Sequence, residues 1–333
     1  MTGPYIASKS KQRGPPMRTI TALCVGLGSI GTRHLKNLTN LCADRGWTLQ
    51  DDALRSDLSR PLRDGVAALL HAQSTDMADA PARYDIVFST NTTSLHADAL
   101  QKIKGRGEAL FIEKPIFSAE QTGLDLADCL PAGQKAYVAA PMRWCGVMLA
   151  LKDRLPGLHP YCARVICSSY LPDWRPGVDY RTVYSAHKAM GGGVTIDLIH
   201  EWDYLVELFG VPEQLYNFKG TYSDLEIDSD DIFIYIARYP TLLAEVHLDY
   251  FGRGYRRSIE LFCHDGSYLA DFGAGTLTLP DGTVQHYEED VNRRYEREME
   301  YFVDYALTGS GESCNPPALA LNVLKLTLGE NVQ

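Results

Sequence analysis

The feature that most constrains the fold of this chain is a glycine-rich turn between a predicted strand and a predicted helix. Residues Thr19–Val25 form a continuous apolar run, which is typical of a parallel strand buried on both faces. The run stops at Gly26-Leu27-Gly28-Ser29-Ile30-Gly31, and residues 29–45 then carry apolar side chains at helical spacing until Gly46. In this order, free N–H groups at the start of the helix can bind the pyrophosphate of a dinucleotide. The sequence therefore predicts a dinucleotide site with contacts from Gly26, Gly28, Ser29, Ile30 and Gly31.

The alternation of strands and helices continues through the first half of the chain. Strands are expected at 47–54, 84–89 and 109–113, and helices at 62–72 and 95–104. Repeated strand–helix–strand order with short connections is typical of a doubly wound parallel sheet. We therefore expect an α/β fold in which residues 18–138 form a Rossmann dinucleotide-binding domain.

The pattern changes after about residue 140, where strands begin to cluster. Strands are predicted at 163–170, 232–239, 243–250 and 257–263, with one long helix at 194–209 and another at 318–328. This order is typical of an α+β domain built on a mostly antiparallel sheet. Because 333 residues are more than one core usually organises, we predict a second domain, residues 139–333, for substrate binding and oligomerisation. Residues 1–17 lack the apolar core of a signal peptide, and we expect a disordered leader there.

Charge and cysteine content narrow the class of protein. A net charge of −10 argues against a nucleic-acid or anionic-membrane partner, and no apolar stretch is long enough to span a bilayer. The eight cysteines are scattered, and none has the close spacing of a zinc or redox motif. We therefore expect reduced core thiols, no metal site, and a cytoplasmic protein that acts on a small molecule.

The form of the cofactor depends on residues at the end of the second predicted strand. An acidic residue about twenty positions after the glycines favours NAD, and Asp51 or Asp52 stands near that position. Arg55 and Ser56, which follow, suit the 2′-phosphate of NADP. We expect NADP or NAD, with Arg55 and Ser56 as ligands of NADP. A solvated loop arginine is the alternative interpretation of Arg55.

Two polar segments stand where predicted strands end, at the edge at which parallel sheets bind ligands. One is Ser89-Thr90-Asn91-Thr92-Thr93-Ser94-Leu95-His96, and the other is Phe111-Ile112-Glu113-Lys114-Pro115. We expect the cofactor site to include residues of both segments, namely Thr90, Asn91, His96 and Glu113.

These segments belong to a series of four ordered motifs. The fourth lies in the second half and reads Gly191-Gly192-Gly193-Val194-Thr195-Ile196-Asp197-Leu198-Ile199-His200-Glu201-Trp202-Asp203. The series resembles the glucose-fructose oxidoreductase / inositol dehydrogenase / MocA family over about residues 19–328. The resemblance implies an NAD(P)-dependent oxidoreductase.

The resemblance also implies roles for individual residues. Lys114 matches the family's lysine beside the nicotinamide and substrate, where it can hydrogen-bond the reacting hydroxyl. His200 matches the family's histidine, a proton acceptor, and Asp197 matches its acidic neighbour. Many members have Asp-x-x-x-His where this chain has Asp-x-x-His, but both spacings put the pair on one face of a helix. Without the resemblance, Lys114 could be a surface lysine and His200 a core histidine.

The substrate side is indicated by a loop-like segment at 169–181 that mixes aromatic, acidic and basic residues. Aromatic rings stack on the C–H faces of sugars while Asp and Arg bind hydroxyls or an anionic group, so the mixture suits a carbohydrate. An ordered loop held by Asp–Arg pairs is the alternative. With the glycine triplet, the segment is most similar to family members associated with bacterial surface-sugar biosynthesis. The residues expected at the substrate are Arg143, Asp173, Trp174, Arg175 and Tyr180.

Together these expectations favour hydride transfer between a nicotinamide cofactor and a secondary alcohol of a sugar, sugar nucleotide or cyclitol. Two alternatives stay open. One is an epimerase, lyase or glycosidase that keeps its cofactor bound and oxidises the substrate transiently. The other is a non-catalytic NAD(P)-binding sensor, although a sensor would be expected to lack Lys114 or His200. The resemblance also implies a homodimer or homotetramer formed through the open face of the second sheet.

Overall fold

The first sheet contains six strands, all parallel, in the order β3-β2-β1-β4-β5-β6. It is seen in a computed structural model that describes residues 18–332. The strands are β1 (Thr19–Val25), β2 (Thr48–Leu54), β3 (Ala72–Ser74), β4 (Tyr84–Ser89), β5 (Gly107–Ile112) and β6 (Lys135–Val138). β1 and β4 match the predicted bounds because short runs rich in apolar residues are buried on both faces of a parallel sheet. The strand order reverses between β1 and β4, which is where such sheets bind ligands.

Three short or medium helices accompany this sheet: α1 (Ser29–Asp44), α2 (His96–Lys102) and α3 (Leu126–Cys129). The prediction of a helix at 62–72 is wrong. Among residues 63–70 only Val66 is fully buried, so a helix there would have no apolar face to pack. The chain instead makes a 3₁₀ turn at Ala67–Leu69 and adds β3 to the edge of the sheet.

The second sheet contains eight strands in the order β14-β13-β12-β11-β7-β10-β9-β8. Its strands are β7 (Cys162–Tyr170), β8 (Gln214–Gly220), β9 (Ile232–Arg238), β10 (Leu243–Asp249), β11 (Phe251–Cys263), β12 (Gly266–Asp271), β13 (Thr276–Thr278) and β14 (Val284–His286). Neighbours are antiparallel except β7 and β10. The predicted mostly antiparallel sheet is therefore confirmed, with additional strands at both edges.

The long helix expected at 194–209 is broken in two. α5 (Val194–Asp197) ends in a turn at Leu198 and Ile199, and α6 (His200–Phe209) follows. Leu198 has a non-helical backbone (φ −102°, ψ 30°). The periodicity of the sequence could not reveal this break, because the apolar residues continue across it.

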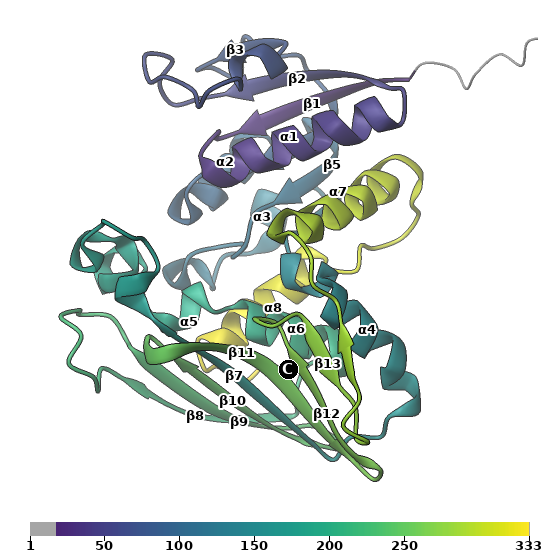
Figure 1. Cartoon of the computed structure of the whole chain (residues 1–333). Coiled ribbons are helices and arrows are strands. Elements are labelled where there is room, and N and C mark those ends of the chain that lie inside the picture. The colour runs from purple at the N-terminus through teal and green to yellow at the C-terminus, as the bar shows by residue number, and fades with distance from the viewer. Residues whose placement is uncertain (1–17, 333) are drawn as a thin grey trace, which may run out of the picture.

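Helices fill the space between the two sheets (Figure 1). α4 (Gly146–Arg154), α6 and α8 (Pro317–Thr327) lie on the inner face of the second sheet and share one apolar core with it. The helix predicted at 318–328 is thus confirmed as α8. No helix within residues 18–332 has the length and apolar character needed to cross a membrane.

The longest helix, α7 (Val291–Thr308), comes from the second half of the chain but packs on the first sheet. Its Phe302 lies 5.8 Å from the ring of Phe88 in β4 and 5.1 Å from that of Phe111 in β5, both in near-perpendicular contacts. Arg45, which directly follows α1, pairs with Asp304 of α7 at 2.6 Å. The chain therefore crosses between the two halves three times, before α4, before α7 and before α8 (Figure 1). A domain boundary near residue 138 stays a prediction.

Candidate active site

The glycine turn after β1 fits tightly against its neighbours at two glycines and is open at the third. Gly26 has a φ of +90°, and a Cβ on it would lie 2.8 Å from the backbone of Asn91. A Cβ on Gly31 would lie 2.3 Å from the carbonyl oxygen of Gly26. Thr90 Oγ1 also donates to that carbonyl at 2.5 Å, so the ends of β1 and β4 are joined. A Cβ on Gly28 would meet nothing within 4 Å, which leaves room for a ligand at the helix start.

The turn opens into a cavity of about 880 Å³ at the carboxyl edge of the first sheet. No side chain within residues 18–332 caps the first turn of α1, so its N–H groups and positive dipole end can bind an anion. Ser29 and Ile30 begin this helix but do not line the cavity with their side chains. The predicted cofactor residues that do line it are Gly26, Gly28, Arg55, Ser56, Thr90 and Asn91.

Asp51 and Asp52, the two acids that would have favoured NAD, do not face this cavity. Asp51 is fully buried, and this burial raises its pKa to about 7. Asp52 accepts hydrogen bonds from Tyr84 Oη and pairs with His71, both at 2.9 Å. Both carboxylates therefore lie within the sheet region and do not face the cofactor cavity.

The residues after β2 that do line the cavity are Arg55, Ser56, Asp57 and Arg60. Arg55 Nη1 donates to Gln73 at 2.8 Å, and its Nη2 donates to the carbonyl oxygen of Arg60. Asp57 accepts from the backbone and hydroxyl of Ser59 at 2.8 and 2.7 Å.

Two predicted cofactor residues, Glu113 and His96, turn out to be buried beneath the site. Glu113 pairs with His34 of α1 at 2.6 Å, and it also accepts from the backbone N–H of Lys114. Burial alone would raise the pKa of Glu113, but the hydrogen bond and charge of His34 and the charge of Lys114 outweigh it and the pKa is lowered. Neither side chain lines the cavity, so both position the loops around it.

His96 joins the loops that follow β4 and β5. Its Nε2 lies 3.0 Å from the carbonyl oxygen of Asn91 and its Nδ1 lies 3.0 Å from that of Pro115. Burial lowers the pKa of His96. The ring therefore fixes the loop that carries Lys114 relative to the loop that lines the cavity.

Lys114 and His200, the residues predicted to carry the chemistry, line one small pocket. Lys114 follows β5, two strands from β1, which corresponds to roughly 10 Å from the glycine turn. His200 begins α6 in the second half of the chain. Burial, together with the positive charges of Lys114, Arg257 and Arg294, holds the pKa of His200 well below its ordinary value. His200 is therefore uncharged at neutral pH and can accept a proton.

Asp197 is not paired with His200, contrary to the helix-face argument. The break after α5 separates the two residues, and tyrosine hydroxyls occupy both oxygens of the carboxylate. Tyr250 Oη donates to Oδ2 at 2.5 Å, and Tyr184 Oη donates to Oδ1. These two tyrosines were missed at the sequence level because they come from distant segments.

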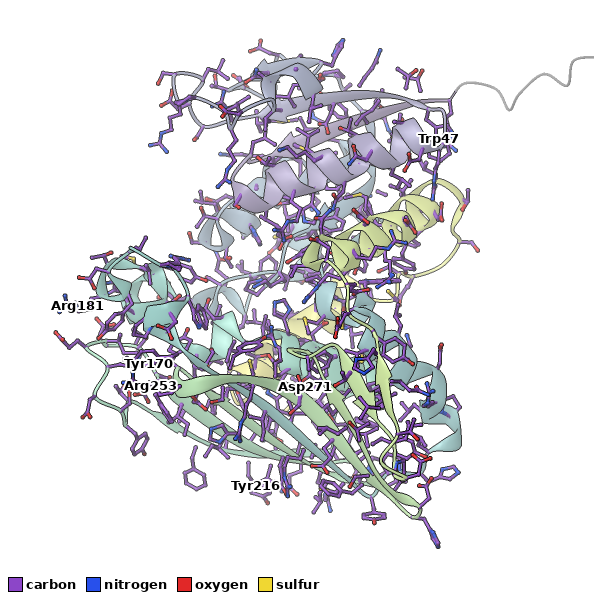
Figure 2. The ribbon with its side chains drawn as sticks, in the orientation of Figure 1. Trp47, Tyr170, Arg181, Tyr216, Arg253 and Asp271 are labelled. Atoms are coloured by element: carbon purple, nitrogen blue, oxygen red, sulfur yellow. The ribbon has the colours of Figure 1, made fainter. Side chains whose placement is uncertain are left out.

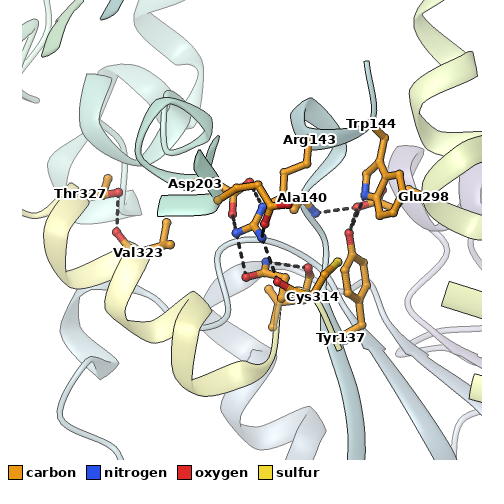
Figure 3. Close-up of polar contacts among 12 residues, drawn as sticks. Tyr137, Ala140, Arg143, Trp144, Asp203, Glu298, Cys314, Val323 and Thr327 are labelled. Carbon is orange, nitrogen blue, oxygen red and sulfur yellow. Dashed lines mark hydrogen bonds and ion pairs between the residues drawn. The ribbon is translucent and has the colours of Figure 1, made fainter. Parts of the chain in front are cut away.

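Arg143, expected among the substrate ligands, is instead buried among hydrogen-bond partners from its own chain. It is 3% exposed and makes a two-pronged pair with Asp203, at 2.9 and 2.7 Å (Figure 3). Its Nη1 donates to Glu207 and to the Cys314 carbonyl oxygen, and its Nη2 to Asn315. All five N–H groups of the guanidinium are thereby used.

The loop expected to bind substrate lies beside Asp197. Trp174 donates to Ser169 Oγ at 3.1 Å and meets the ring of Tyr250 edge-on at 5.3 Å. Asp173 and Arg175 are exposed, and Tyr180 Oη accepts from the backbone of Glu226 at 3.2 Å. The structure does not place these side chains in the pocket of Lys114 and His200.

Helix α7 supplies charged residues to this region that the sequence reasoning missed. Glu298 is fully buried and accepts from Tyr137 Oη at 2.8 Å and from the Ala140 N–H at 2.6 Å (Figure 3). Burial raises the pKa of Glu298 to about 8. The signal was present in the sequence, because Asp290 caps the helix and apolar residues recur at helical spacing through Met299, Phe302 and Val303.

Comparison with known proteins relates the fold to dehydrogenases. No protein-family model matches the sequence, and no curated protein sequence is significantly similar to it. Levoglucosan dehydrogenase in complex with NADH and levoglucosan has a TM-score of 0.77 with this chain, at 14% identity over 94% of this chain and 96% of the other. myo-Inositol 2-dehydrogenase from Lactobacillus plantarum has a TM-score of 0.72 at 18% identity, over 93% and 96%.

A sugar-nucleotide enzyme is similar to the same extent. UDP-N-acetylglucosamine 3-dehydrogenase from Acidithiobacillus ferrooxidans has a TM-score of 0.69 at 17% identity, over 94% of this chain and 96% of the other. At these identities the likeness concerns the fold. The chain thus has the two-sheet fold of these dehydrogenases along nearly its whole length.

Proposed function

We propose that the protein is an NAD(P)-dependent dehydrogenase that oxidises a secondary alcohol of a sugar, sugar nucleotide or cyclitol. The observation that carries the proposal is the meeting of Lys114 and His200 in one pocket, from opposite halves of the chain. The residues of the glycine turn fit a dinucleotide, since Gly28 faces open space and the start of α1 is uncapped. The solved dehydrogenases with this fold support the same activity.

Lys114 and His200 have different roles at the reacting hydroxyl. A nicotinamide cofactor held at the glycine turn would supply the hydride acceptor: oxidation of the alcohol to a ketone would convert NAD(P)⁺ to NAD(P)H and release one proton from the hydroxyl. His200 accepts that proton from the hydroxyl, since its lowered pKa keeps the imidazole uncharged. The Lys114 ammonium donates a hydrogen bond to the same oxygen and stabilises the negative charge that develops there.

The test is substitution of each residue in turn. Lys114→Met and His200→Gln should each lower turnover at least about 100-fold and leave NAD(P)H affinity, measured by fluorescence titration, nearly unchanged. Lys36→Met, on the exposed face of α1, is the matched control and should keep full activity. Full turnover by Lys114→Met would contradict the mechanism, and a protein that binds neither NAD(H) nor NADP(H) would contradict the whole proposal.

Net accumulation of NAD(P)H separates this function from the two alternatives. An epimerase, lyase or glycosidase with transient oxidation would turn over substrate without net reduction of the cofactor. A sensor would bind the cofactor and turn over nothing. The presence of both Lys114 and His200 in one pocket favours an enzyme over a sensor.

For the cofactor we propose NADP in preference to NAD. Arg55, Ser56 and Arg60 line the ribose end of the cavity, while Asp51 and Asp52 are buried elsewhere. Arg55→Ala should therefore weaken NADPH binding about tenfold, the usual scale for a lost charge-assisted contact with phosphate, and change NADH binding little. Stronger binding of NADH than of NADPH by the unaltered protein would contradict this choice.

We also propose a cytoplasmic homo-oligomer. All eight cysteines are free thiols, which suits a reducing compartment. The outer face of the second sheet exposes Tyr216, Phe218, Ile234 and Ile236. Tyr216 lies opposite Ile236 and Phe218 opposite Ile234 across β8 and β9, so the four form one apolar patch of the kind that binds a second copy.

A further inference from the structure

Helix α7 carries three arginines close together, and only one of them has no acidic partner. Arg293 pairs with Glu296 at 3.0 Å, and Arg297 pairs with Glu289 at 2.7 Å. Arg294 has no carboxylate within ion-pair distance among residues 18–332. Its Nε is buried without a hydrogen-bond partner in the part of the chain that the structure describes, and its Nη1 lies 2.8 Å from the thioether of Met142. A thioether is a weak acceptor, so the guanidinium keeps most of its hydrogen-bonding capacity.

Arg294 stands near the start of α7 and contacts Met142, whose chain neighbour Arg143 pairs with Asp203, a residue that lines the pocket of Lys114 and His200. Met142, which it contacts, belongs to the 3₁₀ turn Pro141–Trp144 that follows β6. Its charge also reaches His200, as do the charges of Lys114 and Arg257. Arg294 thus belongs to the surroundings of the pocket, although it comes from a helix that packs on the first sheet.

The charges around this pocket do not balance. Most charged groups have an opposite partner: Arg257 with Glu201 at 2.7 Å, Asp203 and Glu207 with Arg143 and Lys152, and Glu113 with His34. Glu298, with its pKa at about 8, is mostly protonated at neutral pH. Lys114 and Arg294 are left as two cations without a carboxylate partner in the described part of the chain.

We propose that Arg294 binds an anionic group of the substrate, so that the substrate is a sugar-like alcohol carrying a carboxylate or a phosphate near the carbon that reacts. A carboxylate or phosphate accepts paired, charge-assisted hydrogen bonds from a guanidinium, which supplies the partners that Arg294 lacks. The inference rests on the proposed function, because it places the anion relative to Lys114 and His200.

A purely structural explanation for Arg294 is a pair with Glu298, four residues further along the same helix face. In the structure the two do not pair, since Glu298 Oε1 accepts from Tyr137 and Ala140 while its Oε2 has no partner among residues 18–332. This explanation predicts that removal of Arg294 lowers stability and leaves ligand preference unchanged.

The experiment measures binding to the protein in complex with NADPH, by fluorescence titration. The probes are D-glucuronate for a carboxylate, D-glucose 6-phosphate for a phosphate and UDP-glucose for a nucleotide diphosphate, each compared with D-glucose. We expect at least one of the anions to bind about tenfold or more tightly than glucose. Arg294→Met should abolish that preference, Arg294→Lys should keep part of it, and Arg293→Met, the matched control on the same helix, should keep all of it.

The outcomes separate this inference from the proposed function. If the protein does not bind NADPH or NADH, the proposed function fails. If it binds the cofactor but none of the three anions is preferred over glucose, only the anionic substrate is wrong, and the unaltered protein alone decides this. If Arg294→Met keeps the preference while its melting temperature falls, Arg294 is a structural partner of Glu298 and the proposal is overturned.

Discussion

Gly28 and Gly31 stand three residues apart in the same turn, yet their surroundings are opposite. Gly28 faces the open cavity, whereas Gly31 presses against the carbonyl oxygen of Gly26 and the hydroxyl of Thr90. The first glycine therefore serves a ligand and the second serves the packing of α1 against the sheet. A pattern of glycines predicts the turn, but it does not tell which glycine leaves room for a ligand and which allows close packing of the helix.

A pair of alanine substitutions separates these two roles. Gly31→Ala should lower the free energy of unfolding by about 2–3 kcal/mol, because its Cβ has no space. Gly28→Ala should cost less than about 1 kcal/mol, since its backbone is extended and its Cβ meets nothing. It should nevertheless weaken NADPH binding, where the methyl group would meet the ligand. Chemical denaturation and fluorescence titration measure the two effects, and equal losses of stability would contradict the assignment.

Glu298 gives the protein a specific dependence of stability on pH. Its pKa is raised from 4.5 to about 8, so the folded protein keeps a proton that the unfolded chain releases. Stability from this group is complete below pH 4.5 and is lost as the pH rises to about 8, by about 1.4 kcal/mol per pH unit. Glu298→Gln removes the titrating carboxyl and with it this pH dependence of stability. The difference in unfolding free energy between the variant and the unaltered protein should therefore move in favour of the variant between pH 5 and pH 8, and a constant difference would contradict the raised pKa.

At the residue scale, the sequence was enough to identify the residues of each motif but not the side chains that contact them. Lys114 and His200 could be placed because each belongs to an ordered motif at a strand end or helix start. The contacts of Arg143 and Asp197 could not be predicted, because they depend on side chains from distant segments. Asp203, Tyr184 and Tyr250 come from other elements, and no spacing rule joins them to their partners.

At the scale of elements, the break between α5 and α6 decides the geometry around His200. The helix is entered through three glycines, of which Gly191 and Gly193 have positive φ values. Gly192 lies so close to the preceding turn that a Cβ would be 2.0 Å from the carbonyl oxygen of Tyr184. The glycines therefore fix both the start of α5 and the position of the tyrosine that holds Asp197.

Two substitutions in this triplet should differ sharply. Gly192→Ala should destabilise the protein by about 2 kcal/mol or more, because three carbonyl oxygens surround its Cβ. Gly191→Asn should cost less than about 1 kcal/mol, since Asn tolerates the left-handed region and the position is open. Thermal unfolding compares them. A tolerated Gly192→Ala would show that the turn can move without cost.

Prediction of elements succeeded where a single local pattern is enough. The strands at Thr19–Val25 and Tyr84–Ser89 are short runs rich in apolar residues between turns, and the helix at Pro317–Thr327 has a full apolar stripe. The strands β13 and β14 are three residues each, and nothing local distinguishes them from turns. Their conformation comes from pairing with β12, which is a tertiary effect.

At the scale of the whole molecule, the second sheet has one covered and one open face. Figure 2 shows Tyr216 projecting from the sheet on the side away from the helices. Phe218 is 81% exposed and lies beside it on β8, which is unusual for a side chain of this size. An edge strand with such residues is expected to be covered by another copy of the chain.

Charges introduced on this patch should separate the oligomer without unfolding the protomer. Phe218→Glu combined with Ile234→Lys should shift the sedimentation coefficient to that of a monomer, since both residues would place charge inside the interface. Val284→Lys, on the opposite edge strand β14, is the matched control and should not change it. A monomeric unaltered protein in analytical ultracentrifugation would contradict the proposed interface.

Hydrogen bonds near β6 hold all three segments that cross between the halves. Gly146 donates to Glu289 at 2.9 Å, which joins the first crossing to the second. Asn315 and Ser313, in the third, bond the backbone of Val138 and Ala136. A protease that cuts at the exposed Glu312 would therefore leave α8 held by its buried side chains and by these contacts. The nicked protein should elute as the intact one while a denaturing gel shows two fragments, so the chain could be expressed as two pieces that reassemble.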